Sequence, residues 1–139
     1  MIEIDIAVVG GGLAGLTAAL EAARLGRRTV NFGGAAPGGL LLSIESVQGL
    51  PEHPDGIPGY DLGPMTQEAA LEAGADCRGA EADAIEREGA HWIVRSAEGA
   101  VRARAVILAP GSHIRPLGIP GEAEFAGKGV SHCASCDAP

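Results

Sequence analysis

Two cysteines near the end of the chain have the spacing of a reactive thiol pair. Cys133 and Cys136 enclose two small residues, and Asp137 follows directly. A C-x-x-C motif brings two thiols close enough for a disulfide, local positive potential lowers the pKa of the attacking thiol, and an adjacent acid could pass a proton. The pair is also half of a zinc site, but structural zinc needs four ligands, and the third cysteine, Cys77, lies far upstream. Because His132 precedes the pair, the haem-attachment order C-x-x-C-H is not met, and we predict a redox pair and no metal.

A glycine-rich turn near the start of the chain is the second feature with chemical meaning. Residues 10–15 read Gly-Gly-Gly-Leu-Ala-Gly and fit the pattern G-x-G-x-x-G. In dinucleotide-binding folds the early glycines make a tight turn and let the backbone approach a pyrophosphate, and the last one lets the helix pack on the strand. The helix N-terminus then supplies N–H groups and partial positive charge. The pattern alone is weak, but here it follows a predicted strand and opens a predicted helix, which favours a nucleotide site over a purely structural turn.

The acid that normally completes this motif is absent. Dinucleotide-binding folds place an Asp or Glu about 20 residues after the glycines, where it binds the ribose hydroxyls, but no acid occurs between Glu21 and Glu45. We infer that other groups hold the ribose or that dinucleotide affinity is impaired. Four later acids are interpreted as a solvated strand edge rather than as catalytic carboxylates: Glu81, Asp83, Glu86 and Glu88. Three histidines without ligand spacing are interpreted as surface residues: His53, His91 and His113.

The elements that must position these motifs alternate as in an α/β fold. In order, the predicted elements are strand 4–9, helix 13–25, strand 28–32, helix 61–73 with Asp61 as its N-cap, and strands 80–86, 91–96 and 100–109. Residues 33–60 are rich in Gly and Pro and predict a long irregular segment of the kind that wraps a ligand. The tail from Gly111 predicts a connector, and Cys77 is interpreted as an inert thiol between helix and strand. Together these elements predict an α/β, Rossmann-like three-layer fold with a small antiparallel β-meander around 80–104.

Composition and charge exclude several classes of function. The chain has 139 residues, with 10 Lys and Arg against 18 Asp and Glu, a formal net charge of −8. This balance argues against nucleic-acid binding, which depends on clustered basic residues, and aromatic platforms for single strands are missing. No run approaches the roughly 18 apolar residues of a membrane span, and the acidic start lacks the basic region of a signal peptide. We expect a cytoplasmic domain without nucleic-acid or membrane partners.

Six short segments carry further motifs. They read Gly-Gly-Gly-Leu-Ala-Gly-Leu (10–16), Ala-Pro-Gly-Gly-Leu-Leu (36–41), Gly-Ile-Pro-Gly-Tyr-Asp-Leu (56–62), Ala-Val-Ile-Leu-Ala-Pro-Gly (105–111), Leu-Gly-Ile-Pro-Gly-Glu (117–122) and Gly-Val-Ser-His-Cys-Ala-Ser-Cys-Asp (129–137). In order and spacing they resemble the low-molecular-weight thioredoxin reductase family of FAD-dependent pyridine nucleotide-disulphide oxidoreductases. The resemblance implies that a hydride passes from NADPH to FAD, that the flavin reduces the cysteine pair, and that the dithiol reduces thioredoxin or a similar disulfide-bearing protein.

The resemblance also assigns roles to individual residues. The residues implied to contact FAD are, in chain order, Gly10, Gly12, Leu13, Ala14, Gly15, Phe32, Gly33, Gly38, Gly39, Leu40, Ala82, Ala109, Pro110 and Gly111. Among them, Phe32 stands where the family has its ribose acid, and Ala82 would offer backbone atoms to the adenine. Cys133 and Cys136 would form the redox disulfide, with Asp137 handling a proton.

The chain is shorter than the family pattern. In the family, an NADPH lobe is inserted between the two halves of the FAD lobe. Here residues 1–116 would form the N-terminal half of the FAD lobe, and residues 117–139 the hinge and the start of a truncated pyridine-nucleotide lobe that carries the C-x-x-C pair. The chain has one G-x-G-x-x-G, so no nicotinamide site is visible, and it lacks the Gly-Asp dipeptide that the family carries in its later FAD segment. It therefore resembles the opening ~40% of a reductase. We expect it to be inactive alone, with an unpaired sheet edge and an apolar face in water, and to be a homodimer when full length.

Three other interpretations stay open. The chain could be a non-catalytic FAD- or dinucleotide-binding module or gene fragment, which the missing lobes and the residues Phe32 and Ala138, the latter in place of a usual Gly, favour. It could be a flavin reductase of the same fold that serves ferredoxin or another acceptor, which the cysteine pair disfavours. It could also be a zinc-binding interaction domain, which metal analysis of the purified protein would exclude.

Overall fold

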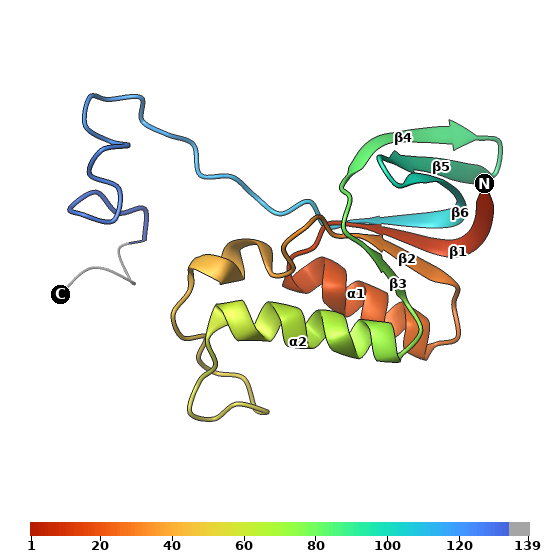
Figure 1. Ribbon diagram of the computed structural model, residues 1–139, viewed down its shortest axis with the longest axis horizontal. Coiled ribbons are helices and arrows are strands. Elements are labelled where there is room, and N and C mark those ends of the chain that lie inside the picture. Colours follow the sequence, from red (N-terminus) through yellow and green to blue (C-terminus); the bar gives the residue numbers. More distant parts are fainter. Residues whose placement is uncertain (134–139) are drawn as a thin grey trace.

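The computed structural model describes residues 1–133, in which a six-stranded sheet carries two helices and is followed by an extended tail (Figure 1). In chain order the elements are β1 (Ile2–Val9), α1 (Leu13–Arg24), β2 (Thr29–Phe32), the short 3₁₀ helix η1 (Gly39–Ser43), α2 (Gly59–Glu72), β3 (Asp76–Arg78), β4 (Ala82–Glu88), β5 (His91–Ser96) and β6 (Gly99–Leu108). None of the helices within this range is long and apolar enough to cross a membrane. The predicted α/β architecture is confirmed.

The sheet follows the order β3-β2-β1-β6-β5-β4. The first four strands of that order run parallel, whereas β5 pairs antiparallel with both β6 and β4. Val9 at the end of β1 pairs with Phe32 of β2 and with Leu108 of β6, so the carboxyl ends of these strands lie at one edge of the sheet. Open α/β sheets bind their ligands outside this edge. The predicted β-meander is present, and it shares β6 with the parallel part of the sheet.

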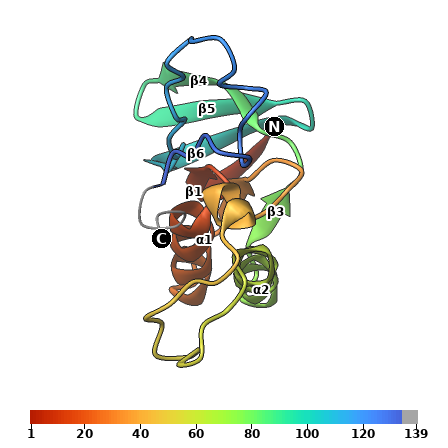
Figure 2. The ribbon, with the colours of Figure 1, turned by 90° about the vertical axis from the view of Figure 1, so that its left-hand side faces the viewer.

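Small side chains allow both faces of the sheet to be covered closely. On one face α1 and α2 lie side by side (Figure 2), and Val8 of β1 packs with the alanines Ala19 and Ala70 of the helices. On the other face, Val94 of β5 and Phe32 of β2 belong to one buried cluster that also includes residues of β1 and β6. Because interiors are packed as densely as organic crystals, alanine-rich helices lie close to their strands. This packing fixes the strand ends that surround the site.

Three details differ from the sequence-based expectation. Helix α2 begins at Gly59, two residues before the predicted N-cap, and Asp61 lies in its first turn, where its charge complements the positive end of the helix. The segment between β2 and α2 is irregular, as predicted, but it contains the short helix η1, which was not expected. Strand β3 was not predicted, because three residues are too few for a periodic pattern. As a result Cys77 lies within a strand and not in a connection.

One edge of β6 is only partly paired. With β1 it pairs from Val101 to Leu108, whereas its ladder with β5 covers only Gly99–Ala103. In the part of the chain that the structure describes, no strand continues this second ladder beside the last residues of β6. Leu108 is 64% exposed there. The outer edge of β6 therefore combines a free strand edge with exposed apolar surface.

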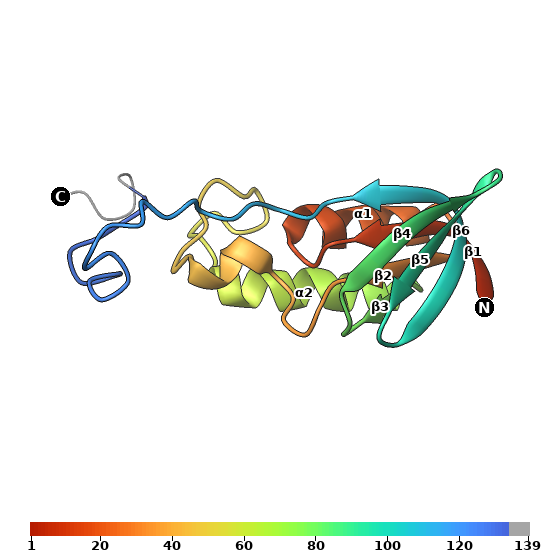
Figure 3. The same cartoon turned by 90° about the horizontal axis from the view of Figure 1, so that it is seen from above.

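The tail leaves the sheet as an extended connector (Figure 3). Residues 111–116 contain no helix or strand, and the chain beyond them closes on itself through local hydrogen bonds. The Glu122 carboxylate accepts hydrogen bonds from the backbone N–H groups of Leu117 and Gly118 at 2.9 and 2.8 Å. These two donors, Leu117 first, hold the pKa of Glu122 below its usual range. The carboxylate thereby fixes the loop that precedes the cysteine segment.

Candidate functional site

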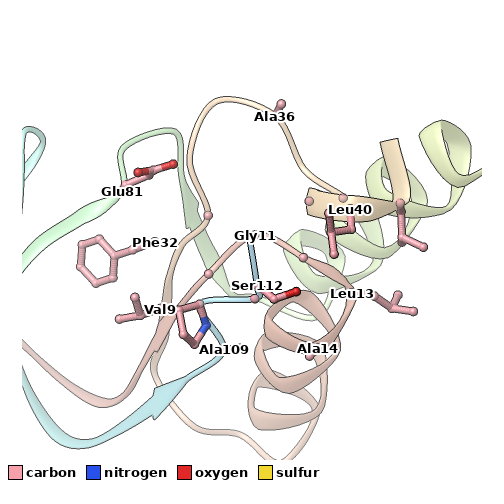
Figure 4. A pocket seen from close by; sticks show the side chains of 18 of the residues that line it. Val9, Gly11, Leu13, Ala14, Phe32, Ala36, Leu40, Glu81, Ala109 and Ser112 are labelled. Carbon is pink, nitrogen blue, oxygen red and sulfur yellow. The ribbon is translucent and has the colours of Figure 1, made fainter. Parts of the chain in front are cut away.

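A pocket of about 690 Å³ opens at the carboxyl edge of the parallel strands (Figure 4). Its walls come from four segments: the β1–α1 turn, the stretch from the end of β2 through η1, the β3–β4 connection and the residues after β6. Ligand pockets typically have volumes of about 300–1,000 Å³, so this space suits a nucleotide-sized molecule. Figure 4 shows Glu81 and Phe32 at one end of the pocket and Leu13 and Leu40 at the other.

The β1–α1 turn requires glycine because several backbone segments meet in it. Gly10 has a positive φ of 121°, and a Cβ on it would lie 2.7 Å from the carbonyl carbon of Ala109. A Cβ on Gly11 would lie 2.7 Å from the carbonyl carbon of Gly33, just beyond β2. A Cβ on Gly15, in the first turn of α1, would lie 2.9 Å from the carbonyl carbon of Gly10. Contacts with the ends of β2 and β6 therefore fix the shape of the turn.

Gly12 plays a different part from its neighbours. Its φ of −75° is accessible to any residue, and no atom lies within 4 Å of the position that its Cβ would take. It is the N-cap of α1, it has no side chain to accept hydrogen bonds, and the first turn contains no acid. The first N–H groups of α1 and their partial positive charge are therefore presented to the pocket, which residues 12–14 line. This arrangement fits the pyrophosphate of a dinucleotide.

Asn31 of β2 supports the turn from within the sheet. Its side chain is fully buried, and Nδ2 donates to the Gly10 carbonyl at 2.9 Å and to the Val8 carbonyl at 3.4 Å. Its Oδ1 has no hydrogen-bond partner in the described part of the chain and faces Gly33, on which a Cβ would lie 2.8 Å away. This role could not be predicted from sequence, because a single Asn in a strand belongs to no motif.

The segment after β2 lies across the glycine turn. The Gly38 N–H donates to the Gly11 carbonyl at 2.7 Å, and Gly38 forms an isolated β-bridge with Gly12. On the far side, Gly63 of α2 allows the loop to come close, since a Cβ there would lie 2.6 Å from the Gly38 Cα. Helix α2 therefore holds the loop against the turn and leaves the exposed Leu40 at the pocket.

All of the predicted cofactor-binding residues except Gly15 line this pocket. Gly15 is buried beneath the turn. The lining also includes residues that the sequence analysis left out or assigned to the surface, among them Gly11, Ala36, Glu81, Ser112 and His113. Ser112 and His113 follow the carboxyl end of a parallel strand, and the general rule for α/β sheets could have placed them here.

The resemblance places Phe32 at the ribose-acid position, but its side chain cannot take that role. Phe32 ends β2, and its ring is 1% exposed within the core, with the Arg78 guanidinium 5.4 Å from the ring centroid. The next two residues, Gly33 and Gly34, have no side chains. The end of β2 therefore offers a ribose no polar side chain.

The cysteines of the described residues do not line the pocket. Burial, and to a smaller extent the Asp76 carboxylate, raise the pKa of the Cys77 thiol in β3, so its reactive thiolate is disfavoured. Cys133 lies at the end of the tail, whereas the predicted site residues Cys136 and Asp137 fall outside the described residues. Within that described part, no three His, Cys, Asp or Glu side chains are arranged to hold a metal ion.

Known proteins share both the sequence and the fold of this chain. A profile of pyridine nucleotide-disulphide oxidoreductases matches residues 4–139. The chain is 38% identical over 137 residues to a thioredoxin reductase of Treponema pallidum (strain Nichols) and 41% identical over 133 residues to one of Mycolicibacterium smegmatis. These matches cover 99% and 96% of this chain but 45% and 43% of the relatives. The chain thus spans less than half the length of the curated relatives it matches.

A solved structure agrees with the sequence comparison. The thioredoxin reductase from Giardia duodenalis superposes with a TM-score of 0.82 at 32% identity, covering 99% of this chain and 45% of that one. The six-stranded sheet, its two helices and the glycine turn therefore form the Rossmann-like FAD-binding fold of thioredoxin reductases, as predicted. With the profile matched over nearly the whole chain, this protein belongs to the pyridine nucleotide-disulphide oxidoreductase family.

Proposed function

We propose that this chain is the N-terminal portion of a thioredoxin-reductase-like, FAD-dependent oxidoreductase. The observation that carries the proposal is the uncapped N-terminus of α1, which faces the pocket at the glycine turn. Its N–H groups and partial positive charge suit the pyrophosphate of FAD. When bound, FAD would supply two-electron redox chemistry, with NADPH as the proposed source of electrons.

Different residues of the pocket would hold different parts of FAD. The backbone N–H groups of residues 12–14 would bind the pyrophosphate, and backbone atoms of Ala82 would face the adenine. Residues 38–40 and 109–111 would enclose the cofactor from two sides and exclude water. Asn31 would keep the turn in shape through its hydrogen bond to the Gly10 carbonyl.

We assign electron exchange with the protein partner to Cys133 and Cys136. The two thiols would reduce a disulfide of a thioredoxin-like protein. The S–S bond of the partner breaks, an S–S bond forms between Cys133 and Cys136, and two electrons and two protons pass to the partner. Asp137 would hold a proton during the exchange. The C-x-x-C spacing and the family match through residue 139 support this assignment.

The proposed division of the chain follows the same comparison. Residues 1–116 would be the N-terminal half of the FAD lobe, and residues 117–139 the hinge and the start of a pyridine-nucleotide lobe. Because the chain spans 45% of the Treponema pallidum relative, we propose that the 139 residues bind FAD but do not turn over alone. The whole enzyme is proposed to act as a homodimer in the cytoplasm, where reducing conditions keep thiols active.

A non-catalytic dinucleotide-binding module is the second candidate. It is favoured by one observation: the pocket lies at the sheet, whereas Cys133 lies at the far end of the tail and does not line it. Such a module would retain the cofactor and transfer no electrons to a disulfide.

The first test is the visible absorption spectrum of the purified 139-residue protein, before and after addition of FAD and gel filtration. We expect the flavin band to elute with the protein. Circular dichroism of the same sample reports whether the chain is folded. A folded chain that retains no flavin would contradict the proposal.

The second test separates the two candidate functions. In a chain that also carries a pyridine-nucleotide-binding lobe, the double change Cys133→Ser and Cys136→Ser should abolish reduction of a thioredoxin disulfide and leave the flavin band intact. The change Cys77→Ser is the matched control and should leave the rate unchanged, since Cys77 lies in β3 away from the pocket. An unchanged rate in the double variant would exclude the assigned cysteines.

A further inference from the structure

Glu81 contributes the only carboxylate to the pocket lining in the described part of the chain. It lies in the connection from β3 to β4, at the edge where the parallel strands end. Its side chain lies against Gly34, because a Cβ placed on Gly34 would be 3.2 Å from the Cγ and Oε1 of Glu81. Figure 4 shows the carboxylate at the Phe32 end of the pocket, away from Leu13.

The strand end that normally carries the ribose acid has none here. Dinucleotide-binding folds use an Asp or Glu after the second strand to bind the ribose hydroxyls. In this chain the ring of Phe32 is buried, and the two glycines that follow it have no side chains. The Glu81 side chain packs over the second of these glycines. The Glu81 carboxylate, from the β3–β4 connection, thus reaches the position at the end of β2 where the ribose acid is missing.

The Glu81 carboxylate is free to accept hydrogen bonds from a ligand. Within residues 1–133 it has no hydrogen bond or ion pair. The arginine of the neighbouring strand end, Arg78, is already engaged, since it pairs with Asp76 at 3.2 Å and lies over the ring of Phe32. The carboxylate therefore keeps its full capacity as an acceptor.

Other acids of the same stretch behave differently. Asp83, Glu86 and Glu88 lie on β4, are exposed, and do not line the pocket. Their interpretation as a solvated strand edge is consistent with these positions. The sequence pattern groups Glu81 with these acids, but its position in the pocket lining sets it apart.

We propose that Glu81 replaces the missing acid, and that its carboxylate accepts hydrogen bonds from the ribose hydroxyls in the ADP half of a bound FAD. This inference rests on the proposed function of the pocket. Charge-assisted hydrogen bonds of this kind are roughly twice as strong as neutral ones. The same carboxylate repels a phosphate on the ribose 2′ oxygen, so the pocket selects adenine nucleotides without that phosphate.

The test measures binding of ADP and of 2′-deoxy-ADP to the 139-residue chain by calorimetry. Three proteins are compared: the unchanged chain, Glu81→Gln, and Asp83→Asn as the matched control on the exposed face of β4. We expect the unchanged chain and the control to bind ADP about tenfold more tightly than 2′-deoxy-ADP. In Glu81→Gln, ADP binding should fall about tenfold and the difference between the two nucleotides should shrink, because the hydroxyl has lost its partner.

A change in the ratio between the two nucleotides cannot come from a merely structural role of Glu81. If Glu81→Gln weakens both nucleotides equally, or weakens neither, the inference is wrong and the proposed function stands. If the unchanged chain binds neither FAD nor ADP, the proposed function itself fails. A second variant, Glu81→Asp, keeps the charge on a shorter side chain. We expect its ratio of ADP affinity to 2′-deoxy-ADP affinity to lie between those of the unchanged chain and Glu81→Gln.

Discussion

Neighbouring glycines of the β1–α1 turn should respond differently to the same substitution. In Gly11→Ala, the new Cβ would lie 2.7 and 2.9 Å from the carbonyl carbon and the Cα of Gly33. Both are backbone atoms held by β2, so neither can rotate away. Overpacking of this severity costs about 3 kcal/mol of unfolding free energy. With an unfolding entropy of about 2.1 cal/mol/K per residue, the melting temperature should fall by about 10 °C.

Gly12→Ala meets no such obstacle. The position of its Cβ is open, and its φ of −75° suits alanine. Alanine is a poorer N-cap than glycine, which should cost under about 1 kcal/mol. The methyl group would instead stand where the backbone has to approach a pyrophosphate. We therefore expect FAD affinity to fall by more than about tenfold with little loss of stability.

Thermal unfolding followed by circular dichroism and FAD binding followed by flavin fluorescence measure the two effects separately. Gly11→Ala should show the larger loss of stability, and Gly12→Ala the selective loss of FAD. Equal losses of stability in the two variants, or unchanged FAD binding in Gly12→Ala, would refute the role assigned to these glycines.

Three further predictions follow from polar and titratable groups. Asn31→Leu removes the donor to the Gly10 carbonyl, and urea unfolding should show a loss of about 1–2 kcal/mol. The pKa of Glu122 is held low by the Leu117 N–H, so its contribution to stability is present above the unfolded pKa and is lost as pH falls through the folded pKa. As the pH is lowered, the NMR shift of the Leu117 amide proton should therefore change only below the pH range in which a glutamate usually titrates. Burial raises the pKa of Cys77, so iodoacetamide at pH 8 should label it more slowly in the native protein than after unfolding.

Each of these measurements has a control within the chain. If Asn31→Leu is as stable as the unchanged chain, the hydrogen bond from Asn31 to the Gly10 carbonyl does not contribute to the free energy of unfolding. Glu122→Gln should abolish the acid transition, whereas Glu124→Gln, at an exposed acid two residues away, should preserve it. Labelling of Cys77 is measured in a background in which the other two cysteines are serine. Equally fast labelling in the native and unfolded states would contradict the burial argument.

The strand-turn-helix at the start of the chain could be predicted from sequence because its signals are local and agree with one another. The apolar run 4–9, the glycines and the leucine spacing each point to the same element boundaries. The antiparallel strands were also predictable, since each is long enough to show a pattern. Strand β3 is only Asp76–Arg78 and carries no such signal. It exists because it pairs with β2, which is a tertiary effect.

Local sequence patterns also predict only part of the pocket. The residues of the glycine turn could be assigned from their motif, which is contiguous in the chain. Glu81 and Asn31 reach the site from separate strands, and no local pattern marks either of them. The burial of Phe32 could not be predicted from sequence, because the last residue of a strand can be either exposed or buried. Its packing in a cluster with residues of β1, β5 and β6 decides it.

The extended connector of residues 111–116 limits the space that the cysteine segment can search. Its six residues reach at most about 20 Å when fully extended, and residues 117–133 add further chain between the pocket and Cys133. Because one chain carries both, encounters between Cys133 and a group bound in the pocket would be intramolecular, and their frequency would depend on the length and stiffness of this linking stretch. Connector length would thus influence internal exchange, but not the collision of an outside partner with Cys133.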